Sequence, residues 1–244
     1  MDKREQIKKY FKPFPKWAVW MIIIGLPFLF LYGLGLVLIG IGIWALADST
    51  KKPSDAQMDA WLEEDLNALH GKALSKTGTD ASEIVGEPVM VTGPRFWDIA
   101  GAGWAFKKGK DNVLRFTPVG ATVLNFTPNQ LIAYSAALDL TTGNALSEST
   151  DEYFYRDVVS VSTKTQSMQV SGTGTGNGEF TGTQQLNAAE TFELTTSGGT
   201  SIQVVLRDPS LIEKMGGGNI PTTRAEKAIQ TVRKMLREKK GEPA

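Results

Sequence analysis

The chain has 244 residues with 26 basic and 26 acidic side chains, one histidine and no cysteine. Without cysteine there are no disulfides, thiolate nucleophiles or zinc–thiolate sites, and one histidine leaves no partner for a two-histidine metal site. Residues 1–52 carry 8 basic and 3 acidic side chains, residues 53–100 carry 3 and 9, residues 101–223 carry 8 and 11, and residues 224–244 carry 7 and 3. Because the middle of the chain is acidic, a nucleic-acid-binding domain with a basic face is disfavoured.

The first 16 residues form a basic segment that precedes a long apolar run. Lysine and arginine outnumber aspartate and glutamate in this segment. An excess of positive charge beside a membrane segment marks the cytoplasmic side of the membrane. We therefore expect residues 1–16 to lie in the cytoplasm.

Residues 17–47 contain no charged side chain and predict a membrane anchor. As one straight helix they would be about 46 Å long, well beyond the roughly 30 Å hydrocarbon core of a bilayer. Pro27 is the natural break, since proline cannot donate a hydrogen bond to the preceding turn. Two forms remain open: a single span over residues 27–47, or a hairpin that turns near residues 32–35 and returns both ends to one side.

Six residues of the anchor are expected to define its place in the bilayer. The tryptophans suit an interfacial belt, and Gly33 and Gly40 would form a strip of small residues that packs against a partner helix. The apolar run is too long for a secretory signal peptide. The expected anchor residues are Trp17, Trp20, Pro27, Gly33, Gly40 and Trp44.

Residues 54–70 predict an amphipathic helix after the anchor. Ser54 and the three residues that follow it read as a capping box at its start. Apolar side chains recur at helical spacing, and acidic and amide side chains take the opposite face. The apolar set is Met58, Trp61, Leu62, Leu66 and Leu69, and the polar set is Asp59, Glu63, Glu64, Asp65 and Asn67. We expect this helix to dock on the following domain, and residues 71–82 to be a linker.

Residues 83–240 predict an antiparallel β domain closed by a helix. Turn residues mark 127–130 and 197–200, and no helix alternates with the strands, which disfavours a parallel nucleotide-binding sheet. The glycine-rich stretch 171–178 lacks the Gly-Lys-Ser/Thr of a phosphate loop and predicts a flexible hairpin tip. The candidate strands are 88–91, 112–117, 121–126, 130–138, 152–155, 158–165, 189–195 and 201–206.

The C-terminal part of the chain turns helical. Asp208 and Pro209 cap a short turn, and Thr223 with Glu226 forms a second capping box. An apolar stripe with spacings of three and four follows, so this helix is expected to lie on the sheet. The stripe consists of Ala225, Ala228, Ile229, Val232 and Leu236.

Few residues of the sequence indicate a catalytic or ligand-binding role. His70 lies near the end of the 54–70 helix and is expected to be a surface histidine. We expect no catalytic residue, no cofactor and no metal site, and therefore no enzyme and no small-molecule substrate. One basic cluster of the β domain reads either as a solvated turn or as a contact for a phosphate headgroup or a partner. It consists of Lys107, Lys108, Lys110 and Arg115.

Two runs resemble the bacterial pleckstrin-homology-like (PH-like) domains, which are related to GRAM domains. They are residues 124–134, Leu-Asn-Phe-Thr-Pro-Asn-Gln-Leu-Ile-Ala-Tyr, and residues 152–161, Glu-Tyr-Phe-Tyr-Arg-Asp-Val-Val-Ser-Val. In that family a strand pair of the form L-T-x-x-R-L-I-x-Y leads to Y-x-D-I-x-S-V. The resemblance covers residues 112–240 and implies a curved antiparallel sheet capped by a C-terminal helix. Anchored members are mostly cytoplasmic, which favours the hairpin form of the anchor.

The expected fold class is therefore α+β, with an N-terminal membrane anchor before the PH-like sheet and its capping helix. The expected function is a membrane-anchored, non-enzymatic binding module at the inner face of a bacterial cell membrane, where the PH-like domain recognises a protein or a lipid. The alternative is a structural subunit of a homo- or hetero-oligomeric assembly. The expected partners are the lipid bilayer and a protein or a second copy of the chain, without nucleic acid.

Overall fold

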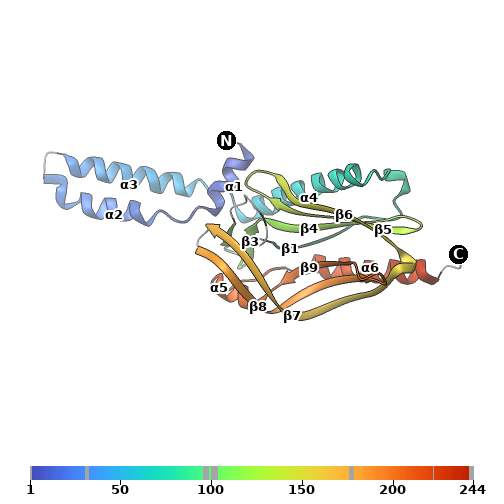
Figure 1. Ribbon diagram of the computed structural model, residues 1–244. Coiled ribbons are helices and arrows are strands. Elements are labelled where there is room, and N and C mark those ends of the chain that lie inside the picture. Colours follow the sequence, from blue (N-terminus) through green and yellow to red (C-terminus); the bar gives the residue numbers. More distant parts are fainter. Residues whose placement is uncertain are drawn as a thin grey trace. The chain divides into compact units, whose positions relative to one another are not determined.

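The computed structural model describes residues 2–30, 33–95, 99, 104–175, 179–221 and 223–241. The chain divides into two compact units, Met1–Met58 and Asp59–Ala244 (Figure 1). The first unit is helical, and the second contains the strands. This is an α+β chain with N-terminal helices, antiparallel sheets and a C-terminal helix, as the sequence predicts.

In the first unit a short helix precedes a pair of antiparallel helices. The short helix is α1 (Lys3–Phe11), and the pair is α2 (Lys16–Gly25) and α3 (Leu34–Thr50). At about 1.5 Å per residue, α2 is roughly 15 Å and α3 roughly 25 Å long. The apolar run 17–47 thus contains two helices that lie side by side (Figure 1), and α3, the longer of them, begins only at Leu34. We call residues 16–50 the hairpin.

Glycines let the two helices of the hairpin approach closely. A Cβ added at Gly42 would lie 2.6 Å from Ile22 Cγ1 and 2.7 Å from the Ala18 carbonyl oxygen. A Cβ at Gly25 would lie 2.9 Å from the carbonyl oxygen of Gly35. Small residues at these positions therefore replace side-chain contact with backbone contact, which is the usual way that apolar helices pack without a hydrophobic driving force.

The chain reverses between α2 and α3 where proline and glycine permit it. α2 ends at Gly25, and Pro27 opens the 3₁₀ turn η1 (Pro27–Phe30). Gly33 precedes α3 with φ of 75°, a left-handed conformation that glycine adopts without strain. The predicted break at Pro27 is confirmed, while Leu31 and Tyr32, part of the predicted turn, lie outside the described residues.

By length and composition, no single helix among the described residues is long and apolar enough to cross a membrane. One bent pair of consecutive helices, α3 and α4 (Asp55–Thr77), meets the requirement together, and α2 is a shorter apolar helix. The apolar member of that pair is α3, because α4 carries Asp59, Glu63 and Glu64 in its first half.

The second unit contains nine strands within the described ranges, arranged in three antiparallel sheets. One sheet has the order β1-β4-β5-β6, one pairs β2 with β3, and one has the order β7-β8-β9. The strands are β1 (Val89–Pro94), β2 (Ala105–Lys108), β3 (Leu114–Thr117), β4 (Val119–Phe126), β5 (Gln130–Asp139), β6 (Asn144–Phe154), β7 (Val158–Thr175), β8 (Glu179–Thr196) and β9 (Ser201–Arg207). The remaining helices are η2 (Ala81–Glu83), η3 (Tyr155–Asp157), α5 (Pro209–Lys214) and α6 (Thr223–Gly241).

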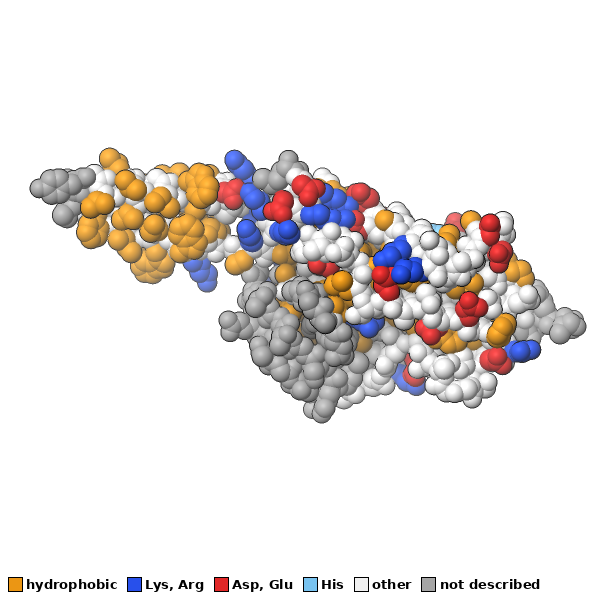
Figure 2. Space-filling view, turned by 45° about the horizontal axis from the view of Figure 1, so that its top comes forward, with side chains coloured by type: hydrophobic (Ala, Val, Ile, Leu, Met, Phe, Trp, Pro, Cys, Tyr) orange, Lys and Arg blue, Asp and Glu red, His pale blue; other side chains and the backbone are white. Residues whose placement is uncertain are grey.

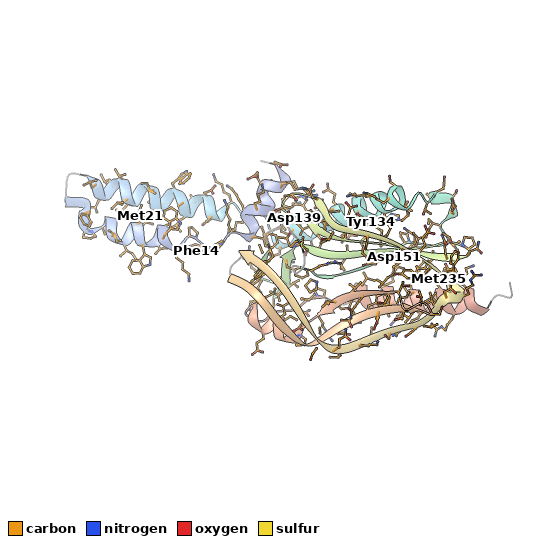
Figure 3. The ribbon with its side chains drawn as sticks, in the orientation of Figure 1. Phe14, Met21, Tyr134, Asp139, Asp151 and Met235 are labelled. Atoms are coloured by element: carbon orange, nitrogen blue, oxygen red, sulfur yellow. The ribbon has the colours of Figure 1, made fainter. Side chains whose placement is uncertain are left out.

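One core joins the four-stranded sheet, the three-stranded sheet and α6. Leu124 of β4, Phe192 of β8 and Val232 of α6 are fully buried in this cluster. The predicted apolar stripe of α6 is confirmed at Ala228, Ile229, Val232 and Leu236, all buried, and Met235 packs against the same cluster (Figure 3). The C-terminal helix therefore closes the two sheets into one domain.

Both predicted tight turns are present. Thr127 N–H donates to the Gln130 carbonyl oxygen at 2.9 Å between β4 and β5, and the Thr127 hydroxyl accepts the Gln130 N–H at 3.1 Å. Thr196 N–H donates to the Thr200 carbonyl oxygen at 2.9 Å between β8 and β9, with Gly199 at φ of 82°. Asp208 caps α5 by accepting the Leu211 N–H at 2.8 Å.

Other predicted boundaries are wrong. α4 extends to Thr77, into the predicted linker 71–82. Ala73 is fully buried, and its burial stabilises the additional turns. Asp65, predicted on the solvent face of that helix, is 6 % exposed. β6 begins at Asn144 rather than at residue 152, and β2 was not predicted at all.

The glycine-rich stretch 171–178 lies at the end of the β7–β8 hairpin, as predicted, and residues 171–175 of it are strand. Ser171 pairs with Thr183 and Thr175 pairs with Glu179, so β7 and β8 continue as a two-stranded ribbon. Residues 176–178 lie outside the described residues.

α4 runs along the four-stranded sheet (Figure 1) and is held there by polar contacts. Lys72 Nζ lies 2.7 Å from Glu148 Oε1 on β6, and Tyr134 of β5 donates its hydroxyl hydrogen to Glu148 Oε2 at 2.9 Å. β6 is an edge strand, and its residues from Ser147 to Glu152 are exposed. These contacts attach the helix to the side of the sheet opposite α6.

Gly93 marks the point where β1 crosses β9. A Cβ at this position would lie 1.8 Å from the carbonyl oxygen of Val205. A backbone oxygen cannot rotate away, so the two strands would have to separate. We expect Gly93→Ala to lower the free energy of unfolding by about 2 kcal/mol, measured by chemical denaturation of the full chain in detergent.

Gly71→Ala is the matched control, because Gly71 lies inside α4 and an added Cβ would meet no atom within 4 Å. Here alanine should raise the free energy of unfolding by about 0.5–1 kcal/mol. Equal stability of the two variants would show that the crossing is not as close as described.

Candidate functional site

Arg115 of β3 is held by two carboxylates. Its Nε and Nη2 donate to the two oxygens of Asp59, each at 2.7 Å, and its Nη1 and Nη2 donate to the two oxygens of Asp111 at 3.0 Å and 2.7 Å. Nη1 also donates to the Val113 carbonyl oxygen at 3.4 Å. The side chain is 7 % exposed. All five N–H groups of the guanidinium are thus directed at protein acceptors.

This clamp corrects the predicted role of Arg115. A guanidinium that is buried and saturated by carboxylates has no donor left for a phosphate headgroup. Its function is structural, since it ties α4 to the β2–β3 pair. Sequence reasoning missed it because Asp59 lies far from Arg115 along the chain.

Two of the four residues of the predicted basic cluster are bound within the domain. Lys108 Nζ donates to the Gly216 carbonyl oxygen at 2.7 Å, beyond the end of α5. Lys107 lies opposite Arg115 in the β2–β3 register, and Lys110 is exposed in the turn between these strands. The four residues share a hairpin of the sheet, but Arg115 and Lys108 are bound to other parts of the domain.

His70 lies within α4 rather than at its end, and it is half-buried. Its Nε2 is 3.3 Å from Oδ1 of Asn125, a fully buried side chain of β4. Asn125 Nδ2 has no hydrogen-bond partner in the described part of the chain. The histidine predicted at the surface is therefore a contact between helix and sheet.

A groove of ≈ 660 Å³ opens beside this histidine, between α4, the segment before β1 and α6. Its polar lining includes Glu63, Asn67, His70, Glu87 and Lys227. Within the described ranges, no three histidine, aspartate or glutamate side chains are grouped so as to hold a metal ion. The residues that line the groove carry charges of both signs.

The hairpin carries the largest exposed apolar surface that the structure describes. Trp20 is 62 %, Leu36 65 % and Trp44 71 % exposed, and most of the exposed large apolar side chains lie between Phe14 and Trp44. Figure 2 shows these hydrophobic side chains gathered over the hairpin, with lysine and arginine at one end of it. A patch of this kind is unusual on a water-soluble surface and marks a site of interaction.

The six predicted anchor residues take different positions in this unit. Trp17, Trp20 and Trp44 are exposed on the two helices, and Pro27 opens the reversal. Gly33 is the turn residue before α3, so it does not form a helical strip with Gly40. The glycines at the contact between the two helices are Gly25, Gly35 and Gly42. Gly35 and Gly42 are seven residues apart, as Gly33 and Gly40 are, so the spacing alone could not show which pair lies at the contact.

Comparisons with models of protein families, with curated proteins and with solved structures found no match.

The clamp around Arg115 makes stability depend on pH. The hydrogen bonds from Arg115 lower the pKa of Asp111 from its ordinary 3.8 to about 2. Because the folded-state pKa is depressed, the stabilisation is fully present above about pH 4 and is lost as the pH falls towards about 2. We expect Asp111→Asn to destabilise the chain at neutral pH, with the difference from wild type shrinking over this window in denaturation curves.

Two controls test the origin of this effect. Asp151→Asn removes the same charge from an exposed position of β6 (Figure 3) and should change stability little. In an Arg115→Gln background, Asp111→Asn should add almost nothing, since its partner has gone. Full additivity of the two substitutions would contradict the clamp.

Proposed function

We propose that this chain is a membrane-anchored, non-enzymatic binding module. The hairpin enters the bilayer, and the β unit recognises a protein or a lipid at the membrane. One observation carries the proposal: the hairpin exposes large apolar side chains over its length, whereas its charged residues, Lys16 and Asp48, lie at its base. Such a surface is stable in hydrocarbon and costly in water.

The hairpin is too short for two full crossings, which favours shallow insertion. α3 is roughly 25 Å long, against roughly 30 Å of hydrocarbon, and α2 is shorter. Both ends of the hairpin then remain at one membrane surface. The excess of lysine before α2 favours the cytoplasmic surface, and hence a cytoplasmic β unit.

The arrangement of the β unit supports the PH-like assignment. Four consecutive strands of one sheet, apart from the inserted β2–β3 pair, are followed by three strands of a second sheet and a closing helix. The resemblance of residues 112–240 implies the same order, a curved antiparallel sheet capped by a C-terminal helix. On this basis we assign partner recognition to the β unit.

A structural subunit of a membrane-associated assembly is the second candidate. Gly40 favours it, because this glycine is exposed on α3 and an added Cβ would meet no atom within 4 Å. An open glycine on an apolar helix allows a second helix to approach closely. The mass of the detergent-solubilised chain separates the candidates: a discrete homo-oligomer favours the subunit, and a monomer the binding module.

The anchor is tested by placing a charge on the hairpin. Leu36 is 65 % exposed on α3, and Leu36→Asp should cost about 3 kcal/mol in hydrocarbon, which is roughly 100-fold in partitioning. We expect this variant to lose flotation with phosphatidylcholine vesicles. Val159→Asp is the control, since Val159 is 61 % exposed but lies on β7, and it should float like the wild type. Equal flotation of both variants would contradict the insertion of the hairpin into the membrane.

The side of the β unit is tested by protease. If both ends of the hairpin face the cytoplasm, protease added outside intact spheroplasts should leave the β unit uncut, whereas permeabilised spheroplasts should show cleavage. Cleavage in intact spheroplasts would place the β unit outside the cytoplasm and support a single crossing.

A further inference from the structure

A hollow of ≈ 370 Å³ lies at the base of the hairpin. It is formed by the end of α1, the connection to α2, the start of α2 and the end of α3. All of these segments belong to the unit Met1–Met58. The hollow therefore brings residues 9–17 beside residues 44–52, on the same unit that carries the exposed apolar surface.

The charge of the hollow is positive. Lys9, Lys12 and Lys52 line it against one acid, Asp48. Lys9 Nζ neutralises that acid, 2.6 Å from its Oδ1, while Lys12 has no ion-pair partner among the described residues. Lys52 Nζ donates to the Lys12 carbonyl oxygen, and burial lowers the pKa of Lys52, so an anion beside it would favour its charged form.

The other walls of the hollow are aromatic and apolar. Phe14 (Figure 3), Trp17 and Trp44 line it and are 56 %, 52 % and 71 % exposed. α2 begins here with no acidic residue in its first turn and no side-chain cap, which leaves the positive end of the helix dipole facing this region. An amphiphile with a negative head suits such walls, because indoles favour the boundary between headgroups and acyl chains.

We propose that this hollow binds the phosphate headgroup of an anionic phospholipid. Lys12 and Lys52 contact the phosphate, and Trp17 and Trp44 contact the glycerol and the first acyl carbons. The inference rests on the proposed insertion of the hairpin, which brings the hollow to headgroup depth. It adds a headgroup site on the anchor to the proposed recognition by the β unit, whose predicted basic cluster includes an arginine, Arg115, that is saturated by carboxylates.

The test compares vesicles of phosphatidylcholine with vesicles in which a quarter of the lipid is phosphatidylglycerol. We expect the full chain to partition more strongly into the anionic vesicles. Diffuse attraction of two lysines to an anionic surface would by itself account for about a 30-fold preference. Because a direct hydrogen bond to a charged group contributes about 1.5 kcal/mol or more, Lys12→Gln with Lys52→Gln should reduce the preference at least about 100-fold. Lys12→Gln alone, which keeps the Lys52 bond to the Lys12 carbonyl, should reduce it at least about tenfold.

Lys16→Gln with Lys51→Gln is the matched control. Both lysines are exposed near the same base and have no ion-pair partner in the described part of the chain, but neither lines the hollow. This pair should reduce the preference by no more than the roughly 30-fold that diffuse attraction of two lysines provides. An equal reduction would mean diffuse attraction to the surface and would overturn the binding site.

Three further outcomes are distinguishable. Equal partitioning of the wild-type chain into both kinds of vesicle would overturn the inference and leave the anchor intact. Failure to bind either kind would overturn the proposed function and the inference together. Glycerol phosphate in solution should compete poorly, because it lacks acyl carbons for the indoles, and full competition would identify soluble phosphate as the ligand instead.

Discussion

The close backbone contact within the hairpin is the constraint on which the first unit depends. An apolar run of this length has no polar face, so its helices must find apolar surroundings and satisfy every backbone group internally. Gly25, Gly35 and Gly42 remove the side chains that would hold α2 and α3 apart, and Pro27 and Gly33 supply the reversal. The reversal brings the lysines before α2 beside those after α3. The basic hollow follows from this reversal. The two ends of the hairpin therefore lie close together, and its opposite end carries no charge.

The β unit is stabilised by different means. Its core is closed by α6, whose Ile229 and Val232 are buried between the sheets. On the other side of the four-stranded sheet, α4 is held by ionic contacts, through Arg115 and through Glu148. A bidentate pair of arginine with carboxylate fixes orientation as well as distance, so it specifies how the helix lies on the domain.

The elements with local signals could be predicted from the sequence. The stripe of α6 repeats at three and four residues, and the turns at 127–130 and 197–200 depend on residues within the turn itself. The first part of β6 has no such signal. Residues 147–152 are all exposed, so polar and apolar side chains do not alternate along them. The composition of residues 71–82 predicted a linker, but α4 extends to Thr77, where the burial of Ala73 stabilises it.

The candidate sites were less predictable than the fold, because their partners are distant in sequence. In the sequence, lysines 107, 108 and 110 form a basic patch with Arg115. In the structure, Asp59 binds the guanidinium of Arg115. The hollow at the hairpin base joins segments that only the reversal of the chain makes neighbours. A pattern along the sequence cannot reveal either, since both depend on tertiary contacts.

The exposed strand β6 has a consequence for chains that are anchored to a membrane as proposed. A protein confined to a surface meets its own copies far more often than in solution, and an unpaired sheet edge is a template for edge-to-edge aggregation. β6 is such an edge, and it carries the exposed carboxylates Asp151 and Glu152 next to each other. Two copies pairing along β6 would bring these negative charges together, which disfavours the pairing. For chains anchored as we propose, this acidic edge opposes edge-to-edge pairing of their β units.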